Sequence, residues 1–167
     1  MKHRVFWARF FLVAALVTAA LIFWFSAQKG EKSQLMSDGI TLRVAHMLKP
    51  DFKDMTESAR LSYLEQLSYI IRKNAHFCEF MLLGFCLMGW QRFGFPERRW
   101  ALCGLWAWGI ATLYAGTDEL HQLFINERSA QLTDVCIDSA GSLTGVLIAA
   151  LVLALALRRI GRQNFVQ

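Results

Sequence analysis

Long apolar runs dominate this chain of 167 residues. Four of them reach or approach the length of about 20 residues that an α-helix needs to cross a bilayer. The expected spans are residues 5–25, 75–90, 100–115 (with room to extend to 124) and 135–157. Hydrophobic residues make up 55% of the chain and charged residues only 19%, which is rare in a soluble domain. The sequence therefore predicts an all-α fold, a polytopic membrane helical bundle with about four transmembrane helices in a single domain covering residues 1–167.

The first apolar run has two interpretations. A basic start followed by an apolar stretch is typical of a secretory signal peptide. The stretch is long for a signal, however, and the bulky pair Trp24 and Phe25 precedes Ser26 and Ala27, which does not make an A-x-A-like cleavage site. We therefore favour a retained transmembrane anchor.

Positive charge indicates how the spans are oriented. Lysines and arginines lie before the first span, in the loop after the second and in the tail, whereas residues 115–134 hold four acidic residues and one basic residue. Because cytoplasmic flanks collect positive charge, both termini are expected in the cytoplasm. The basic residues form no stripe on a polar domain, so the net charge of +5 does not indicate a nucleic-acid partner. The expected partner is the lipid bilayer.

The segment 26–74 is the least hydrophobic part of the chain and is expected outside the membrane. Apolar residues within it recur at spacings of three and four: Leu61, Leu64, Leu67 and Ile71. This pattern predicts an external amphipathic helix over residues 56–71, with Asp54 as N-cap and Glu57 three residues later. The helix is expected to lie on the outer leaflet or to pack over the bundle.

The four cysteines include no CxxC pair: Cys78, Cys86, Cys103 and Cys136. They are predicted to be small buried hydrophobic residues. A disulfide between Cys78 and Cys136 at the outer surface is the alternative.

Ionisable residues gather at the expected outer face of the spans. At the start of the second span, Arg72, His76 and Glu79 are spaced to share one face of a continuous helix. The end of the third span and the start of the fourth offer similar faces: Tyr114, Asp118 and His121 or Gln122, then Asp134, Asp138, Gly141 and Gly145. The two glycines have the GxxxG spacing that lets a neighbouring helix approach closely. Three helices are thus expected to present polar faces at the same depth in the membrane.

Charged groups in hydrocarbon cost roughly 2.5 to 3.5 kcal/mol each on insertion scales, so they usually face the bundle interior and pair. Five carboxylates stand against three bases here, an excess of two negative charges: Glu79, Asp118, Glu119, Asp134 and Asp138 against Arg72, Lys73 and Arg128. A protonated carboxylate or histidine, a bound cation or a cationic part of a substrate must offset this excess.

These residues carry a resemblance to a known family. The motifs, in order, are Phe25-Ser26-Ala27-Gln28, Arg72-Lys73-x-Ala75-His76-Phe77-x-Glu79-Phe80, Leu83-Gly84, Tyr114-Ala115-x-x-Asp118-Glu119-x-His121-Gln122, Arg128 and Asp134-Val135-x-x-Asp138-x-x-Gly141. Together they resemble the VanZ-like family of membrane proteins from about residue 25 to 145. The departures are Phe80, where Tyr is often found, and Asn126-Glu127, where a Pro-Gly pair is common. The resemblance implies a multi-pass protein of the bacterial plasma membrane and a link to teicoplanin resistance, without a particular reaction.

Three hypotheses for the charged residues remain open. An enzyme active site would act on a lipid-linked or cell-wall substrate through acid–base residues: His76, Glu79, Asp118, His121, Asp134 and Asp138. A binding or transport site would recognise a polar headgroup or a glycopeptide through polar contacts: Arg72, Lys73, Tyr114, Glu119, Gln122 and Arg128. In a structural role, the charges would pair and fix the register of the helices.

A divalent metal is a variant of the enzyme hypothesis. His76 and Glu79 lie one helical turn apart, and Asp118 and His121 repeat that arrangement. Two histidines and two carboxylates are suitable ligands if they converge, although neither spacing is a recognised metal signature.

Overall fold

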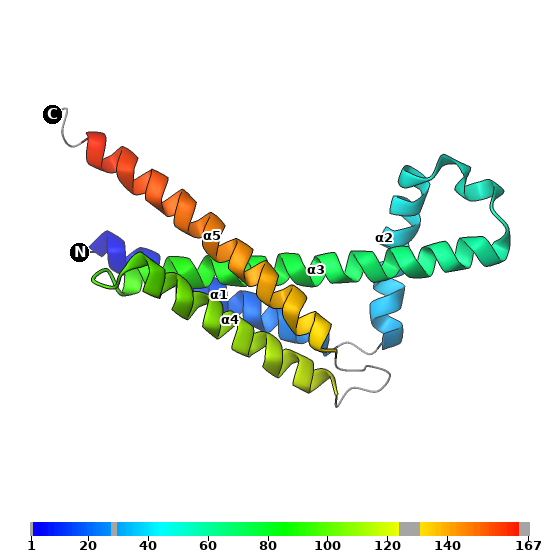
Figure 1. Ribbon diagram of the computed structural model, residues 1–167, viewed down its shortest axis with the longest axis horizontal. Coiled ribbons are helices and arrows are strands. Elements are labelled where there is room, and N and C mark those ends of the chain that lie inside the picture. Colours follow the sequence, from blue (N-terminus) through cyan, green and yellow to red (C-terminus); the bar gives the residue numbers. More distant parts are fainter. Residues whose placement is uncertain (1, 28–29, 124–130, 164–167) are drawn as a thin grey trace.

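The computed structural model describes residues 2–27, 30–123 and 131–163 (Figure 1). These residues form five α-helices, one short 3-10 helix and no strand: α1 (Lys2–Ser26), α2 (Gly30–Leu48), η1 (Pro50–Asp54), α3 (Glu57–Gly94), α4 (Trp100–Gln122) and α5 (Leu132–Gln163). The prediction of an all-α fold is confirmed.

Four of the helices, α1, α3, α4 and α5, form an antiparallel bundle (Figure 1). Helices α1 and α4 run in one direction and α3 and α5 in the other, so α1 begins and α5 ends at the same end of the bundle. Helix α3 is central, because it packs against α1, α4 and α5. The antiparallel order brings the ends of α1 and α4 and the start of α5 together at the opposite end.

The bundle core combines small residues on α4 with larger ones on its neighbours. Small residues occupy every fourth position of the buried face of α4, each at most 1% exposed: Cys103, Ala107, Ala111 and Ala115. Small side chains let helices approach closely. Ile22 of α1 and Phe80 and Met88 of α3 belong to the same core.

Glycines set the distance between α3 and α5. A Cβ atom on Gly141 would overlap the carbonyl oxygen of Phe77, and one on Gly145 would overlap that of Met81. Gly84 of α3 approaches the backbone of α5 in the same way. The close helix approach predicted from the GxxxG spacing is confirmed, and α3 is the neighbour.

Helix α3 is longer than the sequence predicted. Its 38 residues measure about 57 Å at about 1.5 Å per residue, roughly twice the hydrocarbon thickness of a bilayer. The predicted amphipathic helix and the second span are one helix, because no glycine or proline interrupts residues 57–83. The predicted cap is also wrong: Asp54 ends η1, and Thr56 occupies the N-cap position without a capping hydrogen bond from its side chain.

The first part of α3 projects beyond the bundle, where α2 crosses it (Figure 1). We call α2, η1 and residues 57–72 the arm. Leu67 forms a second apolar core with Ala45 of α2 and Phe52 of η1, and the predicted apolar positions Leu64 and Ile71 pack against it. The fourth such position, Leu61, is 62% exposed. The amphipathic segment therefore packs against α2 and η1 rather than over the bundle.

Two helices in the described part of the chain are long and apolar enough to cross a membrane: Lys2–Ser26 and Leu132–Ala156. These correspond to the first and fourth predicted spans. The second and third spans stay a prediction. Helix α4 does resemble a lipid-facing helix in one respect, because Leu105 and Leu113 are 58% and 74% exposed.

The cysteines match their prediction in part. Cys86 and Cys103 are buried, as expected, but Cys78 and Cys136 are exposed. All four are free, so the alternative disulfide is wrong.

The glycine contact between α3 and α5 can be tested by adding one methyl group at Gly145. Gly145→Ala is expected to lower the midpoint of thermal unfolding in detergent, because overpacking costs about 1–3 kcal/mol. Gly109→Ala on α4 is the matched control, since no atom lies within 4 Å of the added Cβ. It should leave the midpoint unchanged or raise it slightly. Equal midpoints for the two variants would show that the helices do not meet at Gly145.

Candidate functional site

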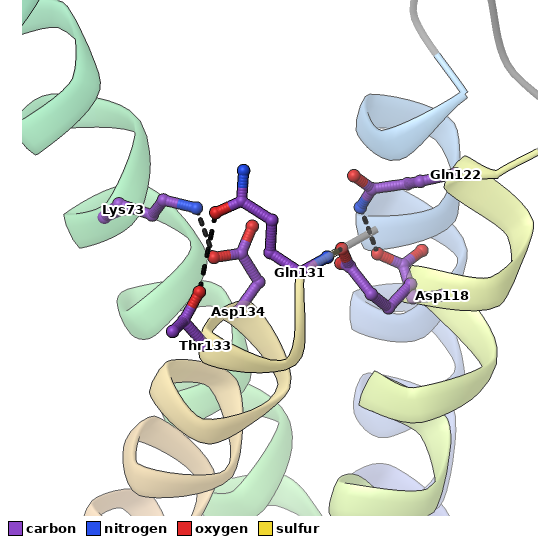
Figure 2. Close-up of polar contacts among 7 residues, drawn as sticks. Lys73, Asp118, Gln122, Gln131, Thr133 and Asp134 are labelled. Atoms are coloured by element: carbon purple, nitrogen blue, oxygen red, sulfur yellow. Dashed lines mark hydrogen bonds and ion pairs between the residues drawn. The ribbon is translucent and has the colours of Figure 1, made fainter. Parts of the chain in front are cut away.

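Polar side chains from all four bundle helices meet at the end opposite the start of α1. Figure 2 shows Lys73 of α3 pointing toward Asp134 of α5, with Asp118 and Gln122 beside them on α4. We call this group the polar cluster: Ser26, Lys73, Glu79, Asp118, Glu119, Gln122, Asp134 and Asp138.

Asp118 lies at the centre of the polar cluster and is 3% exposed. Its Oδ2 atom accepts a hydrogen bond from Oγ of Ser26 at 2.7 Å and another from Nε2 of Gln122 at 3.1 Å. Its Oδ1 atom is buried and accepts no hydrogen bond from any described residue. Ser26 was not predicted as a site residue, although the motif that begins at Phe25 was a signal for it.

Asp138 is the second deeply buried carboxylate, also 3% exposed. Within the described part of the chain, its Oδ1 atom likewise has no hydrogen-bond partner. Four other carboxylates lie close enough to interact with it electrostatically: Asp118, Asp134, Glu119 and Glu79. The close approach of α5 to α3 at Gly141, one turn further along, brings Asp138 to this position. The structure thus brings together acids that are up to 59 residues apart in the chain.

Two further acids of the cluster, Asp134 and Glu119, are held by a partner. Lys73 and Asp134 form an ion pair, with side chains 18% and 22% exposed (Figure 2). Glu119 accepts a hydrogen bond from the backbone N–H of Gln131 at 2.5 Å. These two contacts join α5 to α3 and to α4 and fix the start of α5.

Two predicted site residues, Tyr114 and His121, contact α1, and a third, His76, lies on α3. The hydroxyl of Tyr114 donates to the carbonyl oxygen of Ala19 at 2.7 Å, which ties α4 to α1. The ring of His121 stacks on Phe23, with centroids 4.6 Å apart. His76 is half-buried on α3. His121 therefore faces α1, and its predicted role as a general base has no support from this geometry.

Basic residues are scarce in the polar cluster. Of the three predicted bases, Lys73 pairs with Asp134, while Arg72 lines a groove between α2 and α3. Arg128 lies outside the described residues. The described cluster therefore holds five carboxylates and one lysine. Such a site favours a hydrogen-bond donor or a positive charge over a phosphate group.

The metal variant has no geometric support. Among residues 2–27, 30–123 and 131–163, no three His, Cys, Asp or Glu side chains converge closely enough to hold a metal ion. One physical reason is that His121 packs its ring against Phe23.

The ion pair between α3 and α5 can be tested by a double-mutant cycle. Lys73→Gln is expected to lower the free energy of unfolding by about 1–3 kcal/mol, because it leaves the largely buried carboxylate of Asp134 unpaired. The double variant Lys73→Gln/Asp134→Asn should lose less than the sum of the two single variants. Thermal unfolding in detergent measures all four proteins. Strictly additive losses in the free energy of unfolding would mean that the ion pair makes no net contribution to stability.

Comparison with known proteins gives a family. A model of the VanZ/LLP1 family matches residues 11–153, which include the whole polar cluster. No curated protein and no solved structure matches the chain. The two membrane-length helices agree with the membrane setting that the sequence predicted. The chain belongs to the VanZ/LLP1 family.

Proposed function

We propose that this protein is a multi-pass protein of the bacterial plasma membrane whose polar cluster faces outward and binds a hydrogen-bond-donating group of a lipid-linked or cell-wall molecule. The donor is a hydroxyl or an amine. One observation supports this proposal above all: Oδ1 of Asp118 and Oδ1 of Asp138 are both buried and lack a donor among the described residues.

Unsatisfied buried acceptors are costly. A buried polar atom left without its hydrogen bond costs about 1–3 kcal/mol, and more if it is charged. Most buried polar atoms in proteins are satisfied, so two such oxygens in one cluster need an explanation. A structural role would be served as well by apolar residues, which often stabilise a fold better than buried charges. A ligand that donates to both oxygens offsets the cost.

The other end of the bundle supports the proposed orientation. The guanidinium of Arg92 lies 4.7 Å from the ring centroid of Trp100, and that of Arg98 lies 4.4 Å from that of Phe95. Arginines with aromatic partners at a helix end suit a cytoplasmic membrane interface. The polar cluster, at the opposite end, would then face outward and be open to envelope molecules.

Binding at this place also offers a route to glycopeptide resistance. A protein that sequesters or displaces a cell-wall molecule at the outer membrane surface would change what a glycopeptide such as teicoplanin can reach. This route needs no chemical step, which agrees with the position of His121 against Phe23.

The direct test is retention of a lipid-linked cell-wall precursor by the purified protein in lipid nanodiscs. Mass spectrometry of the bound fraction is expected to show the precursor unchanged and in stoichiometric amount. Asp118→Asn and Asp134→Asn should each abolish retention, and Asp138→Asn should weaken it at least tenfold, while all three variants still insert into the membrane. Glu97→Gln, an exposed acid at the opposite end, should bind like the wild type.

Two outcomes would contradict the proposal. Conversion of the precursor into a new product would replace binding by catalysis. Undiminished retention in the three cluster variants would place the binding elsewhere on the protein.

A further inference from the structure

The polar cluster holds far more acid than base. Five of its members are carboxylic acids and one is a lysine: Glu79, Asp118, Glu119, Asp134 and Asp138 against Lys73. In the described part of the chain, the lysine is already engaged in its ion pair with Asp134. Asp118 and Asp138 are each 3% exposed, so solvent ions screen their charges poorly. The excess of acid therefore favours a ligand with a positive charge.

Two separate side chains each leave one oxygen for such a ligand. Oδ1 of Asp118 on α4 and Oδ1 of Asp138 on α5 are buried and accept no hydrogen bond from a described residue. The two carboxylates lie close enough to interact electrostatically. The other oxygen of Asp118 already accepts from Ser26 and Gln122. A single group that satisfies both free oxygens must therefore bring at least two hydrogen-bond donors.

The number of donors distinguishes the chemical groups that could bind. A hydroxyl has one donor, whereas a primary ammonium has three and carries a positive charge. Hydrogen bonds from a charged donor to a carboxylate are roughly twice as strong as neutral ones. A guanidinium is also charged, but its planar fork pairs best with both oxygens of one carboxylate. Oδ2 of Asp118 is occupied by two hydrogen bonds, so the compact ammonium fits better.

We propose that the polar cluster binds a primary ammonium group, carried on the peptide part of a lipid-linked cell-wall precursor. This inference rests on the proposed function and narrows the bound donor to one of its two forms. One N–H donates to Oδ1 of Asp118 and a second to Oδ1 of Asp138, while the positive charge offsets the excess of acid. The headgroup of an aminophospholipid fits less well, because its phosphate lies close to its amine and would meet the carboxylates.

The probe is a lipid-linked precursor with one free primary amine on its peptide, incubated with the full chain in phosphatidylcholine nanodiscs. Two modified forms accompany it. Acetylation of the amine removes its charge, whereas reductive dimethylation keeps the charge and leaves a single N–H. Each modified form is expected to bind at least tenfold more weakly than the free amine, because each leaves a buried carboxylate oxygen without a donor.

One variant assigns the contact to Asp138. Asp138→Asn should bind the free and the acetylated precursor equally, because the charged acceptor on α5 is gone. Glu97→Gln, an exposed acid at the opposite end of the bundle, is the matched control and should keep the full preference for the free amine. Circular dichroism confirms that both variants are folded. The comparison of the three precursor forms on the wild type does not depend on either variant.

The source of the ammonium is tested by the lipid of the nanodiscs. Phosphatidylethanolamine nanodiscs should retain as much precursor as phosphatidylcholine nanodiscs. Displacement of the precursor by phosphatidylethanolamine would contradict the peptide as the source and assign the site to a lipid headgroup.

Three other outcomes would overturn the ammonium contact, and they separate it from the proposed function. Equal retention of the free and acetylated forms by the wild type would exclude the ammonium and leave the proposed function intact, because another donor would then bind. Equal retention of the free and dimethylated forms would show that charge alone is recognised. Retention of no form would contradict the proposed function and this inference together.

Discussion

Backbone contact between α3 and α5 sets the arrangement of the helical bundle. Gly141 and Gly145 allow α5 to lie against the carbonyl groups of α3, and Gly84 completes the contact from the other side. Side chains of any size at these positions would push the two helices apart. The contacts between α3 and α5 at the polar end depend on this distance, including the pair between Lys73 and Asp134.

Helix α3 connects the two parts of the molecule. Its second half is the centre of the bundle, and its first half carries the arm with α2 and η1. The polar cluster lies where the two halves meet, because Lys73 and Glu79 follow directly after the arm. A rigid helix running through both parts fixes the arm and the cluster relative to one another. Helix α3 therefore contributes to two polar surfaces, the acidic cluster in the bundle and a groove in the arm that Glu65 and Arg72 line.

The sequence predicted what local patterns determine. Apolar runs predicted the helices of the bundle, and the GxxxG spacing predicted the close approach of α5 to another helix. Helix α2 was missed because Gly30–Leu48 mixes polar and apolar residues without a long run. The continuity of α3 is not predicted from the sequence, because the change from polar to apolar composition after Asn74 resembles an element boundary, although the helix continues through it.

The candidate site was predictable only in part. Helical spacing placed the acids at one depth, but the partners of each side chain depend on tertiary structure. Ser26 of α1 donates a hydrogen bond to Asp118 of α4, the ring of His121 stacks on Phe23, and Arg72 lines the groove between α2 and α3. No pattern along the chain specifies these directions, because each depends on which neighbouring helix lies opposite.

Cysteine labelling in intact cells tests the central claim, that the middle of α3, the end of α4 and the start of α5 meet on the outer side of the membrane. Asn74→Cys, Thr133→Cys and Glu97→Cys, each at an exposed position, would be made in a variant without its four native cysteines. A maleimide that cannot cross the membrane is expected to label residues 74 and 133 from outside, and residue 97 only after the cells are permeabilised. Labelling of residues 74 and 133 from opposite sides would contradict this account.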